Sequence, residues 1–488
     1  MSANSQLKRE IGLFSAIAIV VANMVGTGIF TTSGFILQEV GSSSALLLGW
    51  FVGGAFALCG ALCYGELGAR YPQAGGEYVY LREAFGKPLA FLSGWISLIV
   101  GFSAPIAAAA IAFSIYMLKA VGAAADTDRV FTLFGVPIVT LSLPVMLAIA
   151  VVVLLSILHV HSLRIGSRVQ NLLTLFKIAL IVGLIGAGIL SSDGSTDHFS
   201  GSLSLNILLD GKFVVALIFI SFAYSGWNAA AYLGGEIKHP SRNIPLAMLA
   251  GTIIVTALYL LLNLVYVYAL PPEEMRGVME VAAAAGARLF GPGIGRWLNG
   301  AISLGLLSVI SAMILAGPRV YYAMSCDGIF FSLFGKVDAT RHTPAHAIGL
   351  QAAIAIAMIV SASYDKLLVY IGFTLSLFAM LTVIGLMRVR FKNPGEDPAY
   401  RTWGYPLTPL IFILGNLWII FFSIRSRPAP VVWGFVTIAA GLGMYVYFHS
   451  TRSHTREKKV KNPPAAQTLL SHRGGAGLKP SKPKEDLS

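Results

Sequence analysis

Charged residues are scarce in this 488-residue chain, since only 12% are Asp, Glu, Lys or Arg, about half the usual fraction in soluble proteins. Hydrophobic residues make up 56%, in runs of about 20 that are long enough to cross a hydrocarbon core roughly 30 Å thick. An ordinary soluble fold is therefore excluded. A membrane β-barrel is also excluded, because its strands alternate within segments of about 10 residues. The sequence predicts an all-α integral membrane protein.

Cysteine is nearly absent, and Cys59, Cys63 and Cys326 all lie in or beside apolar segments. Such residues indicate neither a disulfide framework nor a zinc site, and we expect no cofactor and no metal. The HExxH and GxSxG motifs of proteases and hydrolases are also missing, so nothing indicates an enzyme. The first ten residues are polar and no cleavable signal pattern follows them, so we expect the first span to direct membrane insertion.

Acidic residues are outnumbered by basic ones, and the net charge is +13. The excess is concentrated in the tail 451–488 and in alternate loops, which by the positive-inside rule places both termini in the cytoplasm. Binding to anionic membrane lipids explains the excess of basic residues better than binding to nucleic acid does. We therefore expect a multi-pass protein of the plasma membrane, of the bacterial inner-membrane type, with membrane lipids as partners and no nucleic acid.

Apolar runs predict twelve spans. They cover residues 11–36, 43–69, 88–118, 138–160, 167–190, 212–236, 245–270, 294–325, 345–362, 365–388, 406–424 and 430–449. The chain divides into a cytoplasmic N-terminus (1–10), five spans (11–190), five more (212–388), helices 11 and 12 (406–449) and a disordered basic tail (451–488). The segment 71–87 is expected to lie along the inner interface with Tyr71, Tyr78 and Tyr80 at headgroup level, and His159 is expected at the interface too.

Two spans carry small residues that interrupt a helix near mid-membrane, Gly26-Thr27-Gly28 in the first and Ser225-Gly226 in the sixth. The two spans lie five apart, and an odd number of crossings reverses direction, so the halves are consistent with inverted repeats. Interruptions at matching positions of two halves indicate a transport site at the midplane. Close helix packing explains either interruption taken alone, and the pairing favours broken helices.

A broken helix exposes amides and carbonyls that lipid cannot satisfy, whereas a zwitterion satisfies both. Free amides at a helix start suit a carboxylate, and the carbonyls that end the neighbouring half-helices suit an ammonium group. The amides are those of Thr27, Gly28 and Ile29, and the carbonyls are near Met24, Phe222 and Ala223. The predicted ligand is an α-amino acid, and neutral ones are favoured because these segments contain no acidic side chain.

Charged residues inside spans are costly, about 2.5–3.5 kcal/mol or more at a helix centre. Lys177 lies about 13 Å beyond Arg168 along a helix, close to the midplane. It is either a structural lysine bonded to carbonyls or a coupling cation that faces span 1, and its depth favours the second role. Glu66, four residues before Arg70, predicts a local ion pair, and Glu236 predicts a loop anchor.

Several motifs together resemble the amino acid–polyamine–organocation superfamily. They are GTGIF, then GALCYGELGARYPQAGGEYVYLREAFGKPLAFLSGW, then FAYSGWNAAAYLGGEIKHPSRNIPLAM, GPRVYYAMSCDGIF and PAYRTWGYP. The third is similar to the L-type branch, which includes bacterial serine/threonine exchangers and the light chains of heteromeric transporters. The resemblance implies the LeuT-type fold, with twelve transmembrane helices, a 5+5 inverted repeat and discontinuous helices 1 and 6. It also implies amino-acid transport by alternating access.

The resemblance also implies roles for single residues. Substrate binding falls to Met24, Thr27, Gly28, Ile29, Phe222, Ala223 and Ser225, with Phe222 as an aromatic gate. Lys177 matches the lysine that replaces a sodium ion, so a coupling role is implied. Gly235-Glu236 stands where the family often has two acidic residues, which puts any role for the pair in doubt. The loop 119–137 lacks the cysteine that joins a heavy chain, so no heavy-chain subunit is expected.

The sequence leaves the mode of action open. Exchange and proton-coupled uptake both remain compatible with a secondary active transporter. A channel, or a membrane-embedded amino-acid sensor or scaffold that signals through the basic tail, remains an alternative.

Overall fold

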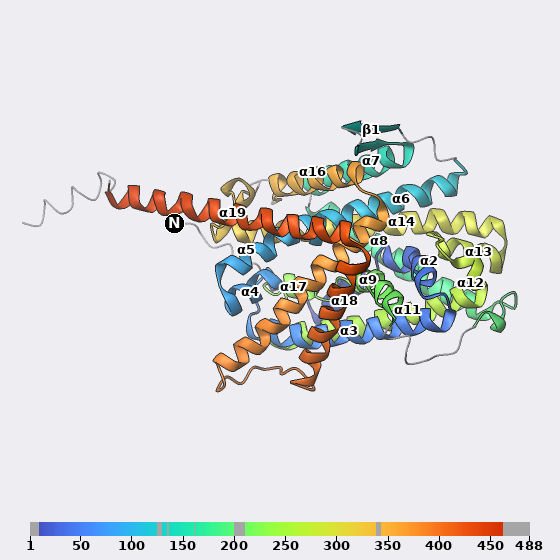
Figure 1. Ribbon diagram of the computed structural model, residues 1–488, viewed down its shortest axis with the longest axis horizontal. Helices are drawn as coiled ribbons and strands as arrows, with labels where there is room; N and C mark the ends of the chain where they lie inside the picture. Colours follow the sequence, from blue (N-terminus) through green and yellow to red (C-terminus); the bar gives the residue numbers. More distant parts are fainter. Residues whose placement is uncertain are drawn as a thin grey trace, which may run out of the picture.

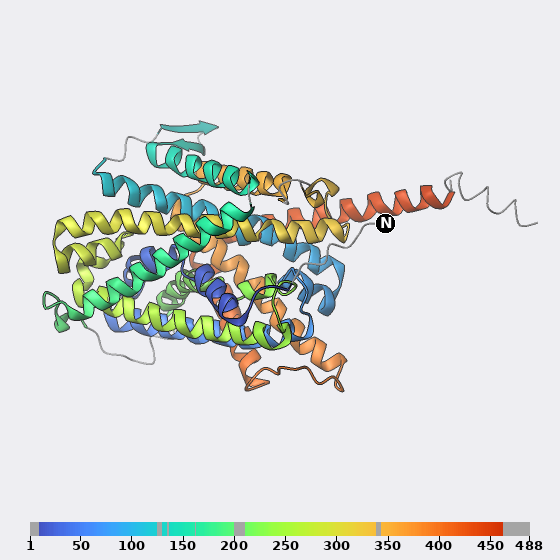
Figure 2. The ribbon, with the colours of Figure 1, turned by 180° about the vertical axis from the view of Figure 1, so that it is seen from behind.

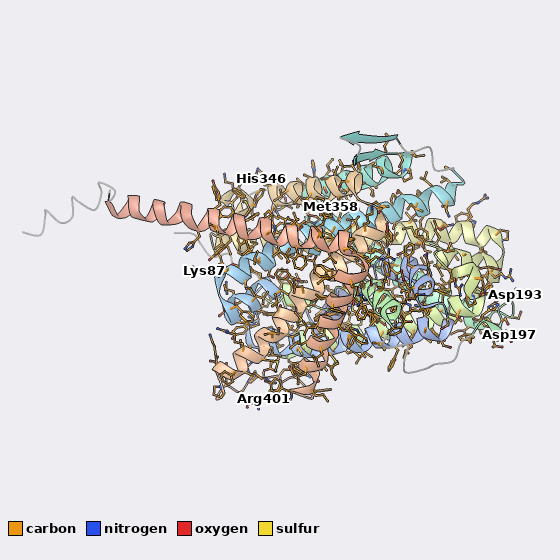
Figure 3. All side chains as sticks on the ribbon, in the orientation of Figure 1. Lys87, Asp193, Asp197, His346, Met358 and Arg401 are labelled. Atoms are coloured by element: carbon orange, nitrogen blue, oxygen red, sulfur yellow. The ribbon has the colours of Figure 1, made fainter. Side chains whose placement is uncertain are left out.

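Long apolar helices, most of them lying side by side, make up nearly all of the computed structural model (Figure 1). The structure describes residues 9–123, 129–133, 136–161, 163–199, 210–337 and 343–461. Charged side chains gather at the two ends of the bundle: Lys87 and Arg401 lie at one end, and Asp193 and Asp197 at the other (Figure 3). Such a layering, apolar between two charged ends, suits a bilayer.

The α-helices are α1 Leu13–Met24, α2 Gly28–Val40, α3 Ser43–Arg70, α4 Glu77–Phe85, α5 Lys87–Ile96, α6 Ala104–Val121, α7 Leu143–His161, α8 Leu163–Leu190, α9 Gly211–Tyr224, α10 Ala229–Tyr232, α11 Pro240–Ala269, α12 Pro272–Met275, α13 Val281–Phe290, α14 Pro292–Ala316, α15 Pro318–Cys326, α16 Ala345–Ser361, α17 Tyr364–Lys392, α18 Leu407–Ser426 and α19 Pro428–Lys461. A π-helix, Ser97–Ser103, joins α5 to α6, and short 3₁₀ turns lie at Thr196–His198 and Ser332–Gly335. The strands are β1 Arg129–Leu133 and β2 Val136–Leu141.

Every predicted span coincides with one or more of these helices. By length and composition, nine helices of the described residues are able to cross a membrane, or ten when α1 and α2 are joined as one bent span. The helices Gly211–Tyr224 and Ala345–Ser361 are apolar but shorter. The protein is therefore a helical, multi-pass membrane protein, and the full count of twelve spans stays a prediction.

One part of the predicted all-α fold is wrong, because β1 and β2 pair as an antiparallel hairpin. The fourth span was predicted from residue 138, but the helix begins only at Leu143, and Val136–Leu141 form β2. The sequence VPIVTL is rich in β-branched residues, which favour strands. An apolar run of this kind looks the same in a hydropathy profile whether it forms a strand or a helix.

The tail also differs from its prediction, since α19 continues to Lys461 and residues 451–461 are helical rather than disordered. Arg, Glu and Lys in this stretch are good helix formers, and extending an existing helix avoids the cost of nucleation. Figure 1 shows this end of α19 projecting past the bundle on the side of α4. Residues 462–488, and most of the predicted N-terminus 1–10, lie outside the described residues.

Three residues that were predicted to face the headgroups at the interface are buried in protein instead. Tyr78 and Tyr80 of α4 are only 2% and 1% exposed, because the apolar face of α4 packs against α5 and α17 rather than against headgroups. Tyr78 donates a hydrogen bond to Asp327, which anchors α4 to the end of α15. His159 is buried and bonds through Nε2 to the Ser311 hydroxyl of α14 at 2.8 Å.

Around the centre of the bundle, α1 packs against α11, α2 packs against α9, and α3 packs against both α9 and α11. From behind, α8 crosses obliquely and contacts α14 and α11 (Figure 2). The short helices α12 and α13 lie at the end away from α4 (Figure 1). This arrangement brings the first and sixth spans together in the core.

A buried ionic cluster fixes the C-terminal end of α3. The predicted pair of Glu66 with Arg70 is present at 3.1 Å. Glu66 is fully buried and also accepts hydrogen bonds from Arg390 of α17 and from the Thr402 backbone amide at 2.8 Å. A buried carboxylate is stable only when its oxygens have such partners.

Replacing Arg390 with methionine removes the cation that bonds both carboxylate oxygens of Glu66. A buried charge left with no partner costs roughly 3–5 kcal/mol, and the loss here is smaller because Glu66 keeps Arg70 and the Thr402 amide. We expect Arg390→Met to lower the Tm in detergent by several degrees. Arg388→Met is the control, since this exposed arginine lies over the Phe85 ring two residues away, and an equal loss in both variants would contradict the prediction.

Candidate functional site

Both interruptions predicted from the sequence are present. The helix α1 ends at Met24 and α2 begins at Gly28, with a bend of 43° between them. The helix α9 ends at Tyr224, and α10 begins only at Ala229. Each break leaves helix ends in the core, where free amides and carbonyls need partners.

The two breaks touch each other through glycines. A Cβ atom on Gly28 would lie 2.4 Å from Cα of Ala223, so only glycine lets α2 approach α9 this closely. Gly226 has a φ of +99°, a conformation that residues with a side chain rarely adopt. A Cβ there would lie 2.8 Å from the Asn23 carbonyl oxygen. The unwound segments therefore pack backbone against backbone.

All three carbonyls predicted to receive an ammonium group have a protein partner, and that of Phe222 accepts a hydrogen bond from the Ser225 backbone amide at 3.0 Å. The Tyr259 hydroxyl of α11 lies 2.7 Å from the Met24 carbonyl oxygen and 3.1 Å from that of Ala223. Tyr259 thus links the ends of α1 and α9. Sequence reasoning missed it, because a tyrosine within an apolar helix is usually a packing residue.

Lys177 lies in the core at the end of α1. It is fully buried, and its Nζ donates to the carbonyl oxygen of Ala22 at 3.0 Å and to that of Val25. These carbonyls terminate the first half-helix, where the helix dipole favours a cation. Hydrogen bonds to these carbonyls are expected whether Lys177 is a structural lysine or a coupling cation, so its part in a transport cycle remains a proposal.

The turn predicted to bind the substrate carboxylate forms the beginning of α2, in the core of the protein. Thr27 is 3% exposed, and its carbonyl oxygen accepts a hydrogen bond from the Thr31 hydroxyl at 2.9 Å. The same Thr31 hydroxyl lies 2.7 Å from that of Tyr364 on α17. Ile29 is fully buried one residue after Gly28. The first amides of α2 have no acceptor within the helix, which is the geometry of an anion site.

A cavity lies beside the two breaks. Of the predicted site residues, Phe222 and Ser225 line it, whereas Met24, Thr27, Gly28, Ile29, Ala223 and Lys177 are not among its described lining residues. The lining adds Asn23 of the first break, Asn228 and Tyr232 of the sixth span, and Gly101 and Phe102 of the π-helix. A π-helix within a longer helix often marks a functional site.

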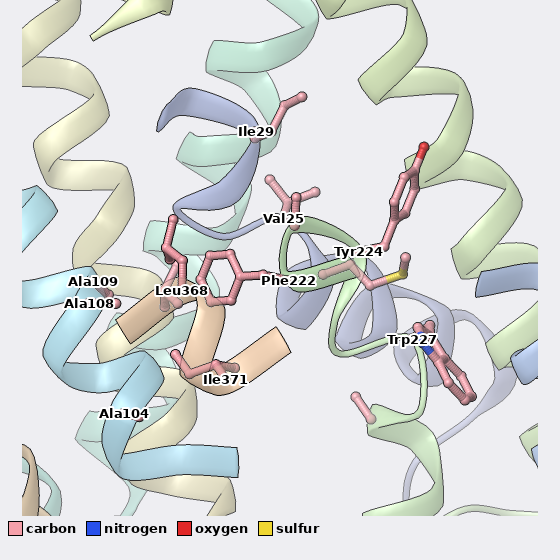
Figure 4. Close-up of a cluster of buried hydrophobic side chains, with 14 of the residues drawn as sticks. Val25, Ile29, Ala104, Ala108, Ala109, Phe222, Tyr224, Trp227, Leu368 and Ile371 are labelled. Carbon is pink, nitrogen blue, oxygen red and sulfur yellow. The ribbon is translucent and has the colours of Figure 1, made fainter. Parts of the chain in front are cut away.

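Two aromatic residues of the sixth span, Phe222 and Trp227, line this cavity. In Figure 4 the Phe222 ring points towards Leu368 and Ile371 of α17, while Trp227 points the opposite way. Trp227 stacks edge-on against Tyr64, with ring centroids 4.7 Å apart, and also meets Phe412. Trp227 is therefore held by rings of α3 and α18, and the gate role of Phe222 stays a prediction.

Two charged residues that sequence reasoning did not assign to the site also line the cavity, Glu77 and Arg319. Arg319 donates to the predicted loop anchor Glu236 at 3.1 Å. Glu77 accepts hydrogen bonds from the Tyr64 hydroxyl at 2.8 Å and from the Asn228 amide at 2.9 Å. It lies between two spans, and burial raises its pKa from 4.5 to about 7. The only sequence signal was a lone acidic residue after Gly75-Gly76.

The sequence is similar to known amino-acid transporters. Residues 11–448 match the family model described as amino acid permease. The b(0,+)-type amino acid transporter 1 of Mus musculus is 30% identical over 91% of this chain and 88% of its own length. The serine/threonine exchanger SteT of Bacillus subtilis (strain 168) is 30% identical, over 90% of this chain and 96% of its own length. The large neutral amino acids transporter small subunit 2 of Mus musculus is 30% identical, over 90% and 81%.

Proposed function

Since the chain belongs to the amino acid permease family, whose members are membrane transporters rather than enzymes, we propose that it is a secondary active transporter of neutral L-amino acids. One observation carries the proposal. The broken first and sixth spans meet backbone to backbone at Gly28 and Ala223 and border a cavity. Free helix ends at mid-membrane are suited to bind the charged amino and carboxyl groups that every amino acid shares.

The architecture that we propose is the LeuT-type fold with twelve spans, in which residues 11–190 and 212–388 form inverted five-helix repeats. Both termini then lie in the cytoplasm, and the substrate site alternates between the two faces of a cell membrane. A relative from Bacillus subtilis supports a bacterial cell membrane. The small-subunit name belongs to a mouse relative, and we propose that this chain works without a heavy-chain subunit, because the loop 119–137 has no cysteine.

Within this site, the amides of Thr27, Gly28 and Ile29 bind the carboxylate, and the carbonyls of Met24 and Ala223 approach the ammonium group once Tyr259 yields its hydrogen bonds. The substrate side chain enters the cavity beside Phe222 and Ser225. Lys177 takes the position of a coupling cation through its bonds to the end of α1. Uptake proceeds by exchange or together with protons.

A preference for neutral side chains follows from the charges around the cavity. Glu77 is hydrogen-bonded by Tyr64 and Asn228, and Arg319 is paired with Glu236. The charged groups that line the cavity in the described part of the chain therefore already have polar partners, and none is placed there as a dedicated partner for a cationic side chain.

The test is competition for uptake by purified protein in liposomes, with each of the standard amino acids as inhibitor. Small or large neutral amino acids should inhibit best, and replacing sodium with choline should change nothing, because Lys177 replaces the sodium ion. Protein-free liposomes give the background. Lysine or arginine as the best inhibitor would contradict the neutral preference, and uptake that neither saturates nor accelerates with internal substrate would indicate a channel.

A further inference from the structure

Glu77 is an acidic residue of the cavity wall that the proposed amino-acid site does not use. It begins α4, between the spans Ser43–Arg70 and Lys87–Val121, and is only 6% exposed. Both of its hydrogen bonds end on Oε1: one comes from the Tyr64 hydroxyl and one from the Asn228 side-chain amide. Asn228 lies in the unwound segment 225–228 that interrupts the sixth span. Glu77 thus ties α4 to a segment that must move if the site opens on this side.

The groups around this carboxyl are mostly neutral. Phenols face it from three helices: Tyr64 from α3, Tyr80 from α4 itself and Tyr232 from α10. Among the residues whose side chains are described, no lysine, arginine or histidine forms an ion pair with Glu77. A buried carboxylate without a cation is costly, and taking up a proton removes that cost.

Charged residues nearby are engaged elsewhere. Arg319 of α15 lines the same cavity but pairs with Glu236. The helices α5 and α17 pack most closely on α4. Their charged residues near α4, Lys87 and Arg388, lie at the end of α4 opposite to Glu77, where Lys87 begins α5 and Arg388 covers the Phe85 ring. Within the described ranges, therefore, no charge replaces the proton as a partner for Glu77.

We propose that Glu77 is a proton-binding site of the transport cycle, which holds a proton while the segment 225–228 covers it and releases the proton to water when that segment moves away. The proton site rests on the proposed function for the cycle itself, but not on the identity of the transported amino acid. Its position on the α4 end of the bundle, where α19 also projects (Figure 1), places it on the predicted cytoplasmic side.

The direction of the pH effect follows from linkage. Burial raises the pKa of Glu77 to about 7 in the closed arrangement, whereas an exposed glutamate has a pKa of about 4.3. The proton therefore binds the closed form more tightly and stabilises it below about pH 7. This stabilisation is lost as the pH rises through about 7, so alkaline pH on the α4 side favours opening.

Uptake by liposomes with the pH on the α4 side varied from about 6 to about 8 tests the proposal, since this range brackets the raised pKa. Wild-type uptake should rise severalfold with a midpoint near pH 7. Glu77→Gln, which resembles the protonated form, should stay at the low rate throughout. Glu83→Gln is the control on the same helix, because Glu83 is exposed, and it should follow the wild type. A wild-type midpoint retained in Glu77→Gln, or a flat wild-type profile, overturns the proposal.

Two further measurements do not depend on Glu77→Gln being active. Tyr64→Phe removes one donor to Oε1 and keeps the ring, so the midpoint should rise by about one pH unit, the size expected for one hydrogen bond to a charged group. Infrared difference spectra of wild-type protein should show a protonated carboxyl band that disappears near pH 7 and is missing in Glu77→Gln. An unshifted Tyr64→Phe midpoint, or the same band in both proteins, contradicts the proposal. Absence of any amino-acid uptake by the wild type, with this band present, would overturn the proposed function alone.

Discussion

Gly28→Ala should weaken substrate binding at least about tenfold, equivalent to about 1.4 kcal/mol. The new methyl group would lie 2.4 Å from Cα of Ala223 and 2.5 Å from its Cβ. Since most of that obstruction is backbone, no side-chain rotation relieves it, and α2 must separate from α9. Separation moves the amides of Thr27, Gly28 and Ile29 away from the sixth span, so the two charged groups of a substrate no longer reach both breaks together. Equilibrium binding of a radiolabelled amino acid to purified protein measures the loss.

The matched control for this variant is Gly186→Ala. Gly186 lies within α8 as Gly28 lies within α2, but a Cβ there meets nothing within 4 Å. This variant should keep wild-type affinity, because alanine favours a helix. Size-exclusion profiles and Tm values show whether Gly28→Ala remains folded. An unchanged affinity in folded Gly28→Ala protein would remove the contact between the two breaks from the binding mechanism.

The features that the sequence predicts well are those with a large physical cost in a membrane. An interrupted helix at Gly26-Thr27-Gly28 or a lysine at position 177 is unfavourable in lipid, so each stands out against the apolar background. The structure places these features together, because Lys177 bonds the last carbonyls of α1. Residues that are energetically unfavourable in a membrane because of their own chemistry could therefore be found from the sequence alone.

Features that depend on distant segments were missed. Glu77 acquires its environment from Tyr64, Asn228 and Tyr232, which come from three other elements. In the sequence it belongs to an amphipathic stretch that looks interfacial. Tyr259 likewise gains importance only because two broken helices end beside its hydroxyl. A sequence pattern shows whether a residue is energetically unfavourable in its own segment. It does not show which distant helix ends will lie beside that residue in the fold.

Lys177→Met should reduce the transport rate about tenfold or more while substrate still binds, a difference of about 1.4 kcal/mol in the barrier. Methionine fills similar space in the core, but it leaves the carbonyls of Ala22 and Val25 without their donor. The end of α1 is then no longer held to α8, and the step that returns the empty site across the membrane loses its cation. Lys177→Arg keeps a charge and should retain more transport than Lys177→Met. Lys212→Met, at an exposed position where the sixth span begins, should transport as the wild type does. Binding and counterflow measured on the same preparations separate turnover from affinity, and Lys177→Met that transports at the wild-type rate would show that the lysine is only a packing residue.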